Sequence, residues 1–171
     1  MKVITLDSID STNNFIKLNI KSLPHLSIVR ARYQTAGRGQ LARQWMSNPN
    51  ENILVSFLFK TFKKSATPQS IEKIAITSCQ NFLLKYGAKA SHKLPNDLLV
   101  DGKKVAGMLI ETKHIDASLE YVILGIGINI NQKNFTGLPN ATSLTLITNK
   151  VFEIDEIFTS FLKECRAFET L

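Results

Sequence analysis

A glycine-bearing loop after the second predicted strand contains groups that could bind a phosphate-containing molecule. Gly37 and Gly39 would let the backbone approach a ligand closely, and two arginines, Arg38 and Arg43, supply fixed positive charge with forked donors. Trp45, the one tryptophan of the chain, offers a flat face for a purine. The loop matches neither GxGxxG nor GxxxxGK(S/T), so the dinucleotide and P-loop mechanisms do not apply. Taken alone, it is better explained as a basic surface loop.

A second polar segment runs from Lys93 to Asp97 and is followed, after a short strand and turn, by Lys104 and Gly107. A carboxylate flanked by lysines suits a site that holds Mg²⁺ and nucleotide phosphate. We therefore take Asp97 as the candidate Mg²⁺ ligand. An ordinary loop before a hairpin is the alternative for this segment alone.

The third segment is an apolar strand interrupted by Gly125 and Gly127. Glycine inside a strand often marks a bulge or a close approach of another group to the backbone. Asn129 and Asn131 fall on one face of the extended chain, so one or both could point into a pocket. A strand packed tightly against a helix would explain the same pattern.

The elements that must position these groups have an α+β pattern. Strands are expected at about 3–6, 26–33, 53–59, 98–100, 103–111 and 121–130, and helices at about 12–20, 68–86 and 154–168. The 53–59 strand reads as buried on both faces. Because the strands cluster in hairpins, a mixed, mostly antiparallel sheet with helices on one face is favoured over a doubly wound parallel sheet.

Local signals support several of these boundaries. Residues 10–12 offer capping side chains for the first helix. Thr67, Pro68 and Gly87 suit the N-cap, first-turn and C′ positions of the second. A two-residue turn, Asp101-Gly102, predicts a type I′ hairpin.

Length and composition limit the number of domains and the kinds of site that the chain can contain, but they do not specify a function. The 171 residues fit one domain, and Lys and Arg exceed Asp and Glu by 21 − 14 = 7. The positive charge is spread along the chain, so a lysine-rich surface explains it at least as well as a nucleic-acid patch, and no DNA partner is expected. Cys79 and Cys165 fall on apolar helix faces, as reduced core residues would, and His25, His92 and His114 show no metal-ligand spacing. Without a signal segment or an apolar run near the ~18 residues of a membrane helix, a cytoplasmic location is expected.

In this order, the polar segments resemble one family. Asp10-Ser-Thr-Asn13, the Gly-Arg-Gly loop ending in Trp45, Pro95-Asn-Asp97, Lys104-Val-Ala-Gly107 and Gly125-Ile-Gly-Ile-Asn129 closely resemble the biotin–protein ligases, over roughly 8–131. The resemblance implies a single catalytic domain over 1–171, related to class II aminoacyl-tRNA synthetases and the biotin–lipoate ligase catalytic domain. It implies two steps: biotin and Mg·ATP give biotinyl-5′-AMP, and a lysine of a biotin carboxyl carrier domain, of acetyl-CoA carboxylase type, then takes the biotin. A homodimer formed edge to edge through the sheet is compatible with it.

The family's functional residues transfer to this sequence by position. The biotin-binding residues implied are Ser11, Thr12, Gln34, Gly37, Arg38, Lys104, Gly107 and Gly125. Those implied for the nucleotide are Arg43, Trp45, Asn96, Asp97 and Asn129, with Asp97 also at the Mg²⁺. The catalytic residues implied are Lys104, Arg38 and Lys93.

The sequence also departs from the family pattern. Leu94 replaces a usual aromatic residue, and Gln40 stands where many members have arginine. Neither the N-terminal helix-turn-helix nor the C-terminal β-domain of many members is expected. Two alternatives follow: a shortened relative that binds biotin or its adenylate without transferring it, and a lipoate–protein ligase. The lipoate–protein ligase is the weaker alternative, because the Arg-Arg-x-x-Gly-Gly-Gly stretch that is usual in those ligases is absent from this sequence.

Overall fold

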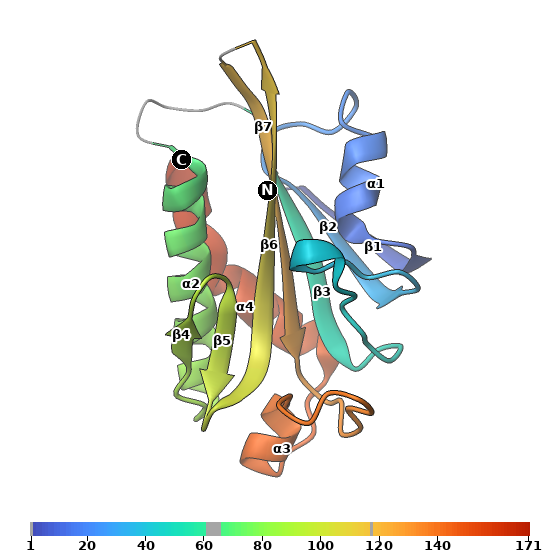
Figure 1. Cartoon of the computed structure of the whole chain (residues 1–171), viewed down its shortest axis with the longest axis vertical. Helices are drawn as coiled ribbons and strands as arrows, with labels where there is room; N and C mark the ends of the chain where they lie inside the picture. Colours follow the sequence, from blue (N-terminus) through green and yellow to red (C-terminus); the bar gives the residue numbers. More distant parts are fainter. Residues whose placement is uncertain (1, 61–65, 117) are drawn as a thin grey trace.

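The computed structural model describes residues 2–60, 66–116 and 118–171, and its framework is a mixed sheet (Figure 1). The described strands, in spatial order, are β1 (Lys2–Ile9), β2 (Ser27–Gln34), β3 (Asn52–Phe59), β7 (Ser118–Asn129), β6 (Lys103–Ile115), β5 (Asp97–Val100) and β4 (Ser91–Lys93). β1 and β2 are parallel, and every other neighbouring pair is antiparallel. The predicted α+β class and mostly antiparallel sheet are confirmed.

The helices lie on both faces of this sheet. One face packs against α2 (Pro68–Lys85), α4 (Ile154–Glu164) and the short 3-10 helix η2 (Cys165–Thr170), as expected. α1 (Thr12–Leu18) instead covers the opposite face, where Ile16 packs on Val29, Leu58 and Ile123 (Figure 1). Successive side chains of a strand point to opposite faces, so a strand that is apolar throughout presents a second patch that needs its own cover. The prediction that helices cover only one face of the sheet was therefore incomplete, because α1 covers the other face.

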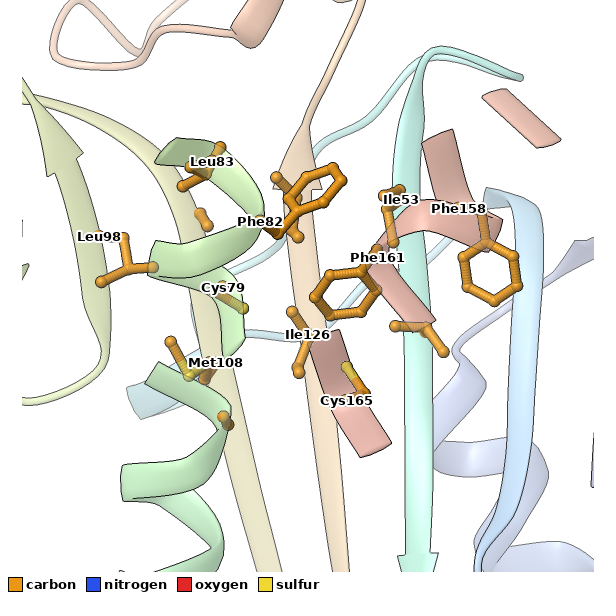
Figure 2. Close-up of a cluster of buried hydrophobic side chains, with 14 of the residues drawn as sticks. Ile53, Cys79, Phe82, Leu83, Leu98, Met108, Ile126, Phe158, Phe161 and Cys165 are labelled. Atoms are coloured by element: carbon orange, nitrogen blue, oxygen red, sulfur yellow. The ribbon is translucent and has the colours of Figure 1, made fainter. Parts of the chain in front are cut away.

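The main core lies between the sheet and α2, α4 and η2. Figure 2 shows Phe82 of α2 and Phe161 of α4 meeting above Ile126 of β7, with ring centroids 5.3 Å apart. Every residue of β3 is buried, so the prediction of a strand covered on both faces is confirmed. This packing gives β6 and β7 a rigid support, and the residues on their other face can be placed accurately.

Cys79 and Cys165 lie in this core as free thiols (Figure 2). Burial raises the pKa of the Cys79 thiol to about 12 and raises that of Cys165 as well. Because the thiolate is the reactive form, we expect neither cysteine to be alkylated by iodoacetamide in the native protein at about pH 8. Both should react once the chain is unfolded in urea. Mass spectrometry of the two samples checks this, and rapid native labelling of either cysteine would contradict the burial.

The cap and turn residues predicted from the sequence for α2 and for the hairpin turn between β5 and β6 have the expected geometry. Thr67 caps α2 reciprocally with Ser70, and Gly87 follows the helix with φ +86°. Asp101 and Gly102 have φ values of +48° and +76°, the positive pair that a type I′ turn requires. Three short elements were not predicted: β4, the 3-10 helix η1 (Gln40–Ala42) and α3 (Leu144–Thr148). None of the described helices is long and apolar enough to span a membrane.

Candidate active site

A pocket of about 910 Å³ opens on the face of the sheet that carries α1. Its walls come from α1, β6, β7, the loop after β2, the segment before β5 and the 135–141 loop. Among the described residues, the lining includes every predicted site residue except Gly37, namely Ser11, Thr12, Gln34, Arg38, Arg43, Trp45, Lys93, Asn96, Asp97, Lys104, Gly107, Gly125 and Asn129. Segments far apart in the sequence thus converge on one cavity.

One end of the pocket is polar and buried. Ser11 and Thr12 are 2% and 4% exposed. The Thr12 backbone N–H donates to Gln34 Oε1 at 2.8 Å, and the Thr12 hydroxyl donates to the same oxygen at 3.0 Å. Ser11 is the N-cap of α1, but within that fully described helix its side chain accepts no capping hydrogen bond, contrary to the expectation. Gln34 instead accepts the hydrogen bond from the free backbone N–H of Thr12, because β2 brings its side chain beside the start of the helix.

Asn13 extends this polar end and was not predicted. Its Oδ1 accepts from the Ser56 hydroxyl, which also lies 2.7 Å from Thr12 Oγ1. A Cβ atom on Gly125 would lie 2.6 Å from Asn13 Oδ1. Gly125 therefore has a packing reason to be glycine, because only a residue without a side chain leaves room for the Asn13 amide.

Behind Asn13 lies a half-buried carboxylate, Glu111 of β6, that two cations share. Asn13 Nδ2 donates to Glu111 Oε2 at 2.8 Å, and Lys17 Nζ and Arg38 NH2 lie 2.6 and 3.1 Å from Oε1. Burial alone would raise the pKa of the Glu111 carboxyl. The hydrogen bonds from Lys17 and Asn13, together with the charges of Lys17 and Arg38, outweigh burial and lower it. Glu111 is therefore an anion at neutral pH.

A lowered pKa in the folded state makes stability depend on pH. The contribution of Glu111 is present above its unfolded-state value and is lost as the pH falls through the lower folded value. We expect the free energy of unfolding to fall less between about pH 5 and pH 3 in Glu111→Gln than in the wild type. Urea unfolding at both pH values measures this difference. Equal falls in the two proteins would show that Glu111 is not stabilised as an anion.

The opposite end of the pocket is cationic and aromatic. Lys104 Nζ lies 2.6 Å from Asp97 Oδ1 and 5.3 Å from the centroid of the Trp45 ring. A Cβ on Gly107 would lie 3.0 Å from both Lys104 and Trp45, and one on Gly127 would lie 2.5 Å from the Trp45 ring. These two glycines let the indole lie against the sheet, and Gly127 is a site residue that the residue-by-residue transfer missed.

Asn96 and Asn129, both predicted to contact the nucleotide, are hydrogen-bonded to the protein backbone. Asn96 Nδ2 donates to the Met108 carbonyl, and the Met108 N–H donates back to Asn96 O at 3.0 Å. Asn129 is 4% exposed and donates from Nδ2 to Thr142 O at 3.0 Å. Both side chains therefore tie pocket walls together, and their contact with a nucleotide stays a prediction.

The glycine loop after β2 folds back on itself. Trp45 N donates to Gly37 O at 2.9 Å, and Gly39 N donates to Arg43 O at 2.7 Å. A Cβ on Gly37 would lie 2.5 Å from the Trp45 carbonyl, so Gly37 shapes the loop instead of lining the pocket. The fold directs Arg38 to Glu111 and leaves Arg43 exposed near the pocket mouth.

The 135–141 loop is the largest part of the site that sequence reasoning missed. Lys104 N donates to Asn140 O at 2.7 Å, and Thr142 N donates to Lys104 O at 2.8 Å. The loop thereby fixes the backbone of Lys104 and contributes Phe135 and Leu138 to the lining. The sequence showed a turn-forming composition here, and Gly137 has φ +75° in the structure, but nothing local indicated Lys104 as the partner of this loop.

A magnesium ion at Asp97 would take part of its oxygen ligands from a substrate. Among the described residues, no group of three or more His, Cys, Asp or Glu side chains could hold a metal ion. Mg²⁺ is commonly bound through one or two carboxylates together with substrate phosphates. Asp97 beside Lys104 fits that pattern, since a phosphate would supply the remaining oxygen ligands.

A mixed sheet with this pocket on one face defines the class of biotin and lipoate ligase catalytic domains. The biotin protein ligase of Aquifex aeolicus, solved with biotin and ATP, superposes with a TM-score of 0.83 at 29% identity, covering 98% of this chain and 69% of that chain. The chain belongs to the biotin/lipoate A/B protein ligase family, whose model matches residues 5–129.

Two curated relatives support this membership. The bifunctional ligase/repressor BirA of Bacillus spizizenii is 32% identical over 98% of this chain and 55% of its own length. The biotin–[acetyl-CoA-carboxylase] ligase of Paracoccus denitrificans is 31% identical over 77% of this chain and 54% of its own. The chain thus spans about half the length of these relatives.

Proposed function

We propose that this protein activates biotin with Mg·ATP to biotinyl-5′-AMP and transfers the biotin to a lysine of a biotin carboxyl carrier domain, of acetyl-CoA carboxylase type. The observation that carries the proposal is the polarity of the pocket. A buried hydrogen-bonding end and a cationic, aromatic end lie in one continuous cavity, so a polar ring system and a nucleotide can be held with their reacting groups together.

The buried end suits the ureido ring of biotin. That ring has a carbonyl acceptor and two N–H donors, and Ser11, Thr12 and Gln34 present hydroxyl and amide groups there. The dithiolane ring of lipoate has no comparable groups. Packing it here would exclude water from the Ser11 hydroxyl and the Gln34 NH₂ group without offering either a partner on the ligand, at a cost of about 1–3 kcal/mol each. This difference favours biotin over lipoate.

The cationic end suits the first chemical step. A biotin carboxylate oxygen attacks the α-phosphorus of ATP, the new P–O bond forms, and the bond to the pyrophosphate oxygen breaks. Negative charge builds on the phosphate oxygens. Lys104 and Lys93, both beside Asp97, supply positive charge at this end, and Arg38 supplies it from the loop that contacts Glu111. Mg²⁺, held with the phosphates near Asp97, would add charge neutralisation. In the second step, the carrier lysine amine attacks the biotinyl carbonyl carbon and AMP leaves.

Nucleotide contacts are assigned to the groups around the indole. Trp45 offers its ring to the adenine, Arg43 lies at the mouth, and Asn96 and Asn129 border the same space. Gly107 leaves the approach to Lys104 open.

The decisive experiment is transfer of labelled biotin to a purified biotin carrier domain with Mg·ATP, run beside biotin-dependent exchange of pyrophosphate into ATP. Exchange together with transfer supports the proposal. Biotin binding by calorimetry without exchange would identify a non-transferring binder. Exchange that depends on lipoate instead of biotin would identify a lipoate ligase.

Gln40 gives a prediction about how well the adenylate is retained. It lines the pocket where many family members have arginine. A charge-assisted hydrogen bond to phosphate contributes about 1.5–3 kcal/mol, so Gln40→Arg should slow release of biotinyl-5′-AMP roughly tenfold or more. Release of labelled adenylate, followed by rapid filtration, measures the rate. Gln40→Met controls for shape without charge, and equal rates in wild type and Gln40→Arg would remove the hypothesis.

A further inference from the structure

We propose that Glu111 is a positioning residue, which acts on adenylation by holding the Arg38 guanidinium at the pocket. The inference rests on the proposed function, since it assigns the reaction that Arg38 serves. Among the described residues, Glu111 is not part of the pocket lining, so its effect must pass through a neighbour. Arg38 lines the pocket and contacts Glu111 directly.

Two elements hold the Arg38 fork from different sides. Its NH2 lies 3.1 Å from Glu111 Oε1 on β6, and its NH1 donates to Asn14 Oδ1 on α1 at 2.9 Å. A planar guanidinium held at two nitrogens has its position and its plane defined together. An arginine fixed before the ligand arrives loses less conformational entropy when the ligand binds.

Glu111 is itself fixed by the polar end of the pocket. A carboxylate only accepts hydrogen bonds, so Asn13 turns its NH₂ group toward Glu111 and its Oδ1 toward Ser56. Ser56 in turn contacts Thr12, which is bonded to Gln34. A continuous chain therefore links Gln34, assigned to the biotin head, with the carboxylate that holds Arg38.

Lys17 explains why the charge of Glu111 matters, beyond its shape. Lys17 Nζ lies 2.6 Å from the same Oε1 atom that Arg38 approaches. The Glu111→Gln change keeps the size of the side chain but removes the counter-charge between two cations. Lys17 and Arg38 would then repel each other, and Arg38, on a loop, would move away more readily than Lys17 on its helix.

A double-mutant cycle tests the inference. Glu111→Gln, Arg38→Ala and the double variant are compared in biotin-dependent pyrophosphate exchange, with kcat and KM for biotin and ATP measured separately. We expect Glu111→Gln to lower kcat/KM roughly tenfold when Arg38 is present and less than about twofold when it is alanine. Glu120→Gln is the matched control, because it removes the same charge from an exposed position on the paired strand β7.

Each outcome separates the inference from the proposed function. An equal fall in both backgrounds would mean that Glu111 acts independently of Arg38 and would overturn the inference alone. A wild type without exchange overturns the proposed function and the inference with it. If circular dichroism shows that Glu111→Gln does not fold, Glu111→Asp replaces it in the cycle, since it keeps the charge but shortens the reach to Arg38. Non-additivity with Arg38→Ala is then still expected.

Discussion

Replacing Lys104 with alanine is expected to lower biotin-dependent pyrophosphate exchange by roughly 10²–10³-fold, the usual effect of removing one donor that stabilises transition-state charge. Lys104 Nζ is the cation that meets both the Asp97 carboxylate and the Trp45 ring. Its backbone is bonded on both sides to the 140–142 segment and its ammonium contacts Asp97, so the side chain is positioned before substrates bind. The loss should fall mainly on kcat, because the phosphate charge it meets grows during the reaction.

The matched control is Lys103→Ala. Lys103 is the adjacent, exposed lysine of β6, and its side chain points to the opposite face. The substitution removes the same charge from the protein and should leave exchange unchanged. The Lys104–Asp97 pair is partly exposed, so neither variant should lose much stability, and thermal unfolding checks this. Equal activity of Lys104→Ala and wild type would exclude Lys104 from the chemistry.

Gly127→Ala is expected to raise the KM for ATP by about tenfold to a hundredfold, since misplacing a binding group by about 1 Å has effects of this order. The added Cβ would lie 2.5 and 2.6 Å from two atoms of the Trp45 ring, so the ring must leave the sheet. Because Trp45 N is bonded to Gly37 O, the movement also disturbs the loop that carries Arg38. The biotin end, bordered by Gly125, should be affected less.

Fluorescence reports this movement directly, because Trp45 is the one tryptophan in the sequence. Its emission should shift to longer wavelength in Gly127→Ala as the indole becomes solvated. Ile128→Val is the control: Ile128 follows Gly127 on β7 but packs into the opposite core. That change costs about 0.5–1.5 kcal/mol of stability and should leave the emission unchanged. Unaltered emission and KM in Gly127→Ala would contradict the seating of Trp45 on the sheet.

The sequence alone predicted some of the site residues and missed others. Gly107 and Gly125 were assigned to the biotin pocket by resemblance, yet the structure gives each a packing reason: Gly107 makes room for Lys104 and Trp45, and Gly125 for Asn13. Asn13 stood inside a quoted motif without a role. Glu111 and the 135–141 loop belonged to no assigned set.

The sequence by itself determined the family and most of the elements, though not β4, η1 or α3. Apolar periodicity, the Thr67–Pro68 helix start and the Asp101–Gly102 turn depend on residues close together in the chain, so local preferences were sufficient to find them. The ordered polar motifs were sufficient to predict which residues line the pocket, with Gly37 as the exception among the described residues.

Only the tertiary structure decided which of these groups touch. Three contacts join segments with no sequence relation to each other. They are the packing of α1 on its face of the sheet, the packing of Trp45 on Gly127, and the Glu111–Arg38 contact. Such contacts depend on strand order and on which side of each strand a residue faces, and a local pattern carries neither. A carboxylate such as Glu111 reads as an ordinary strand residue until the fold brings α1 and the glycine loop to it.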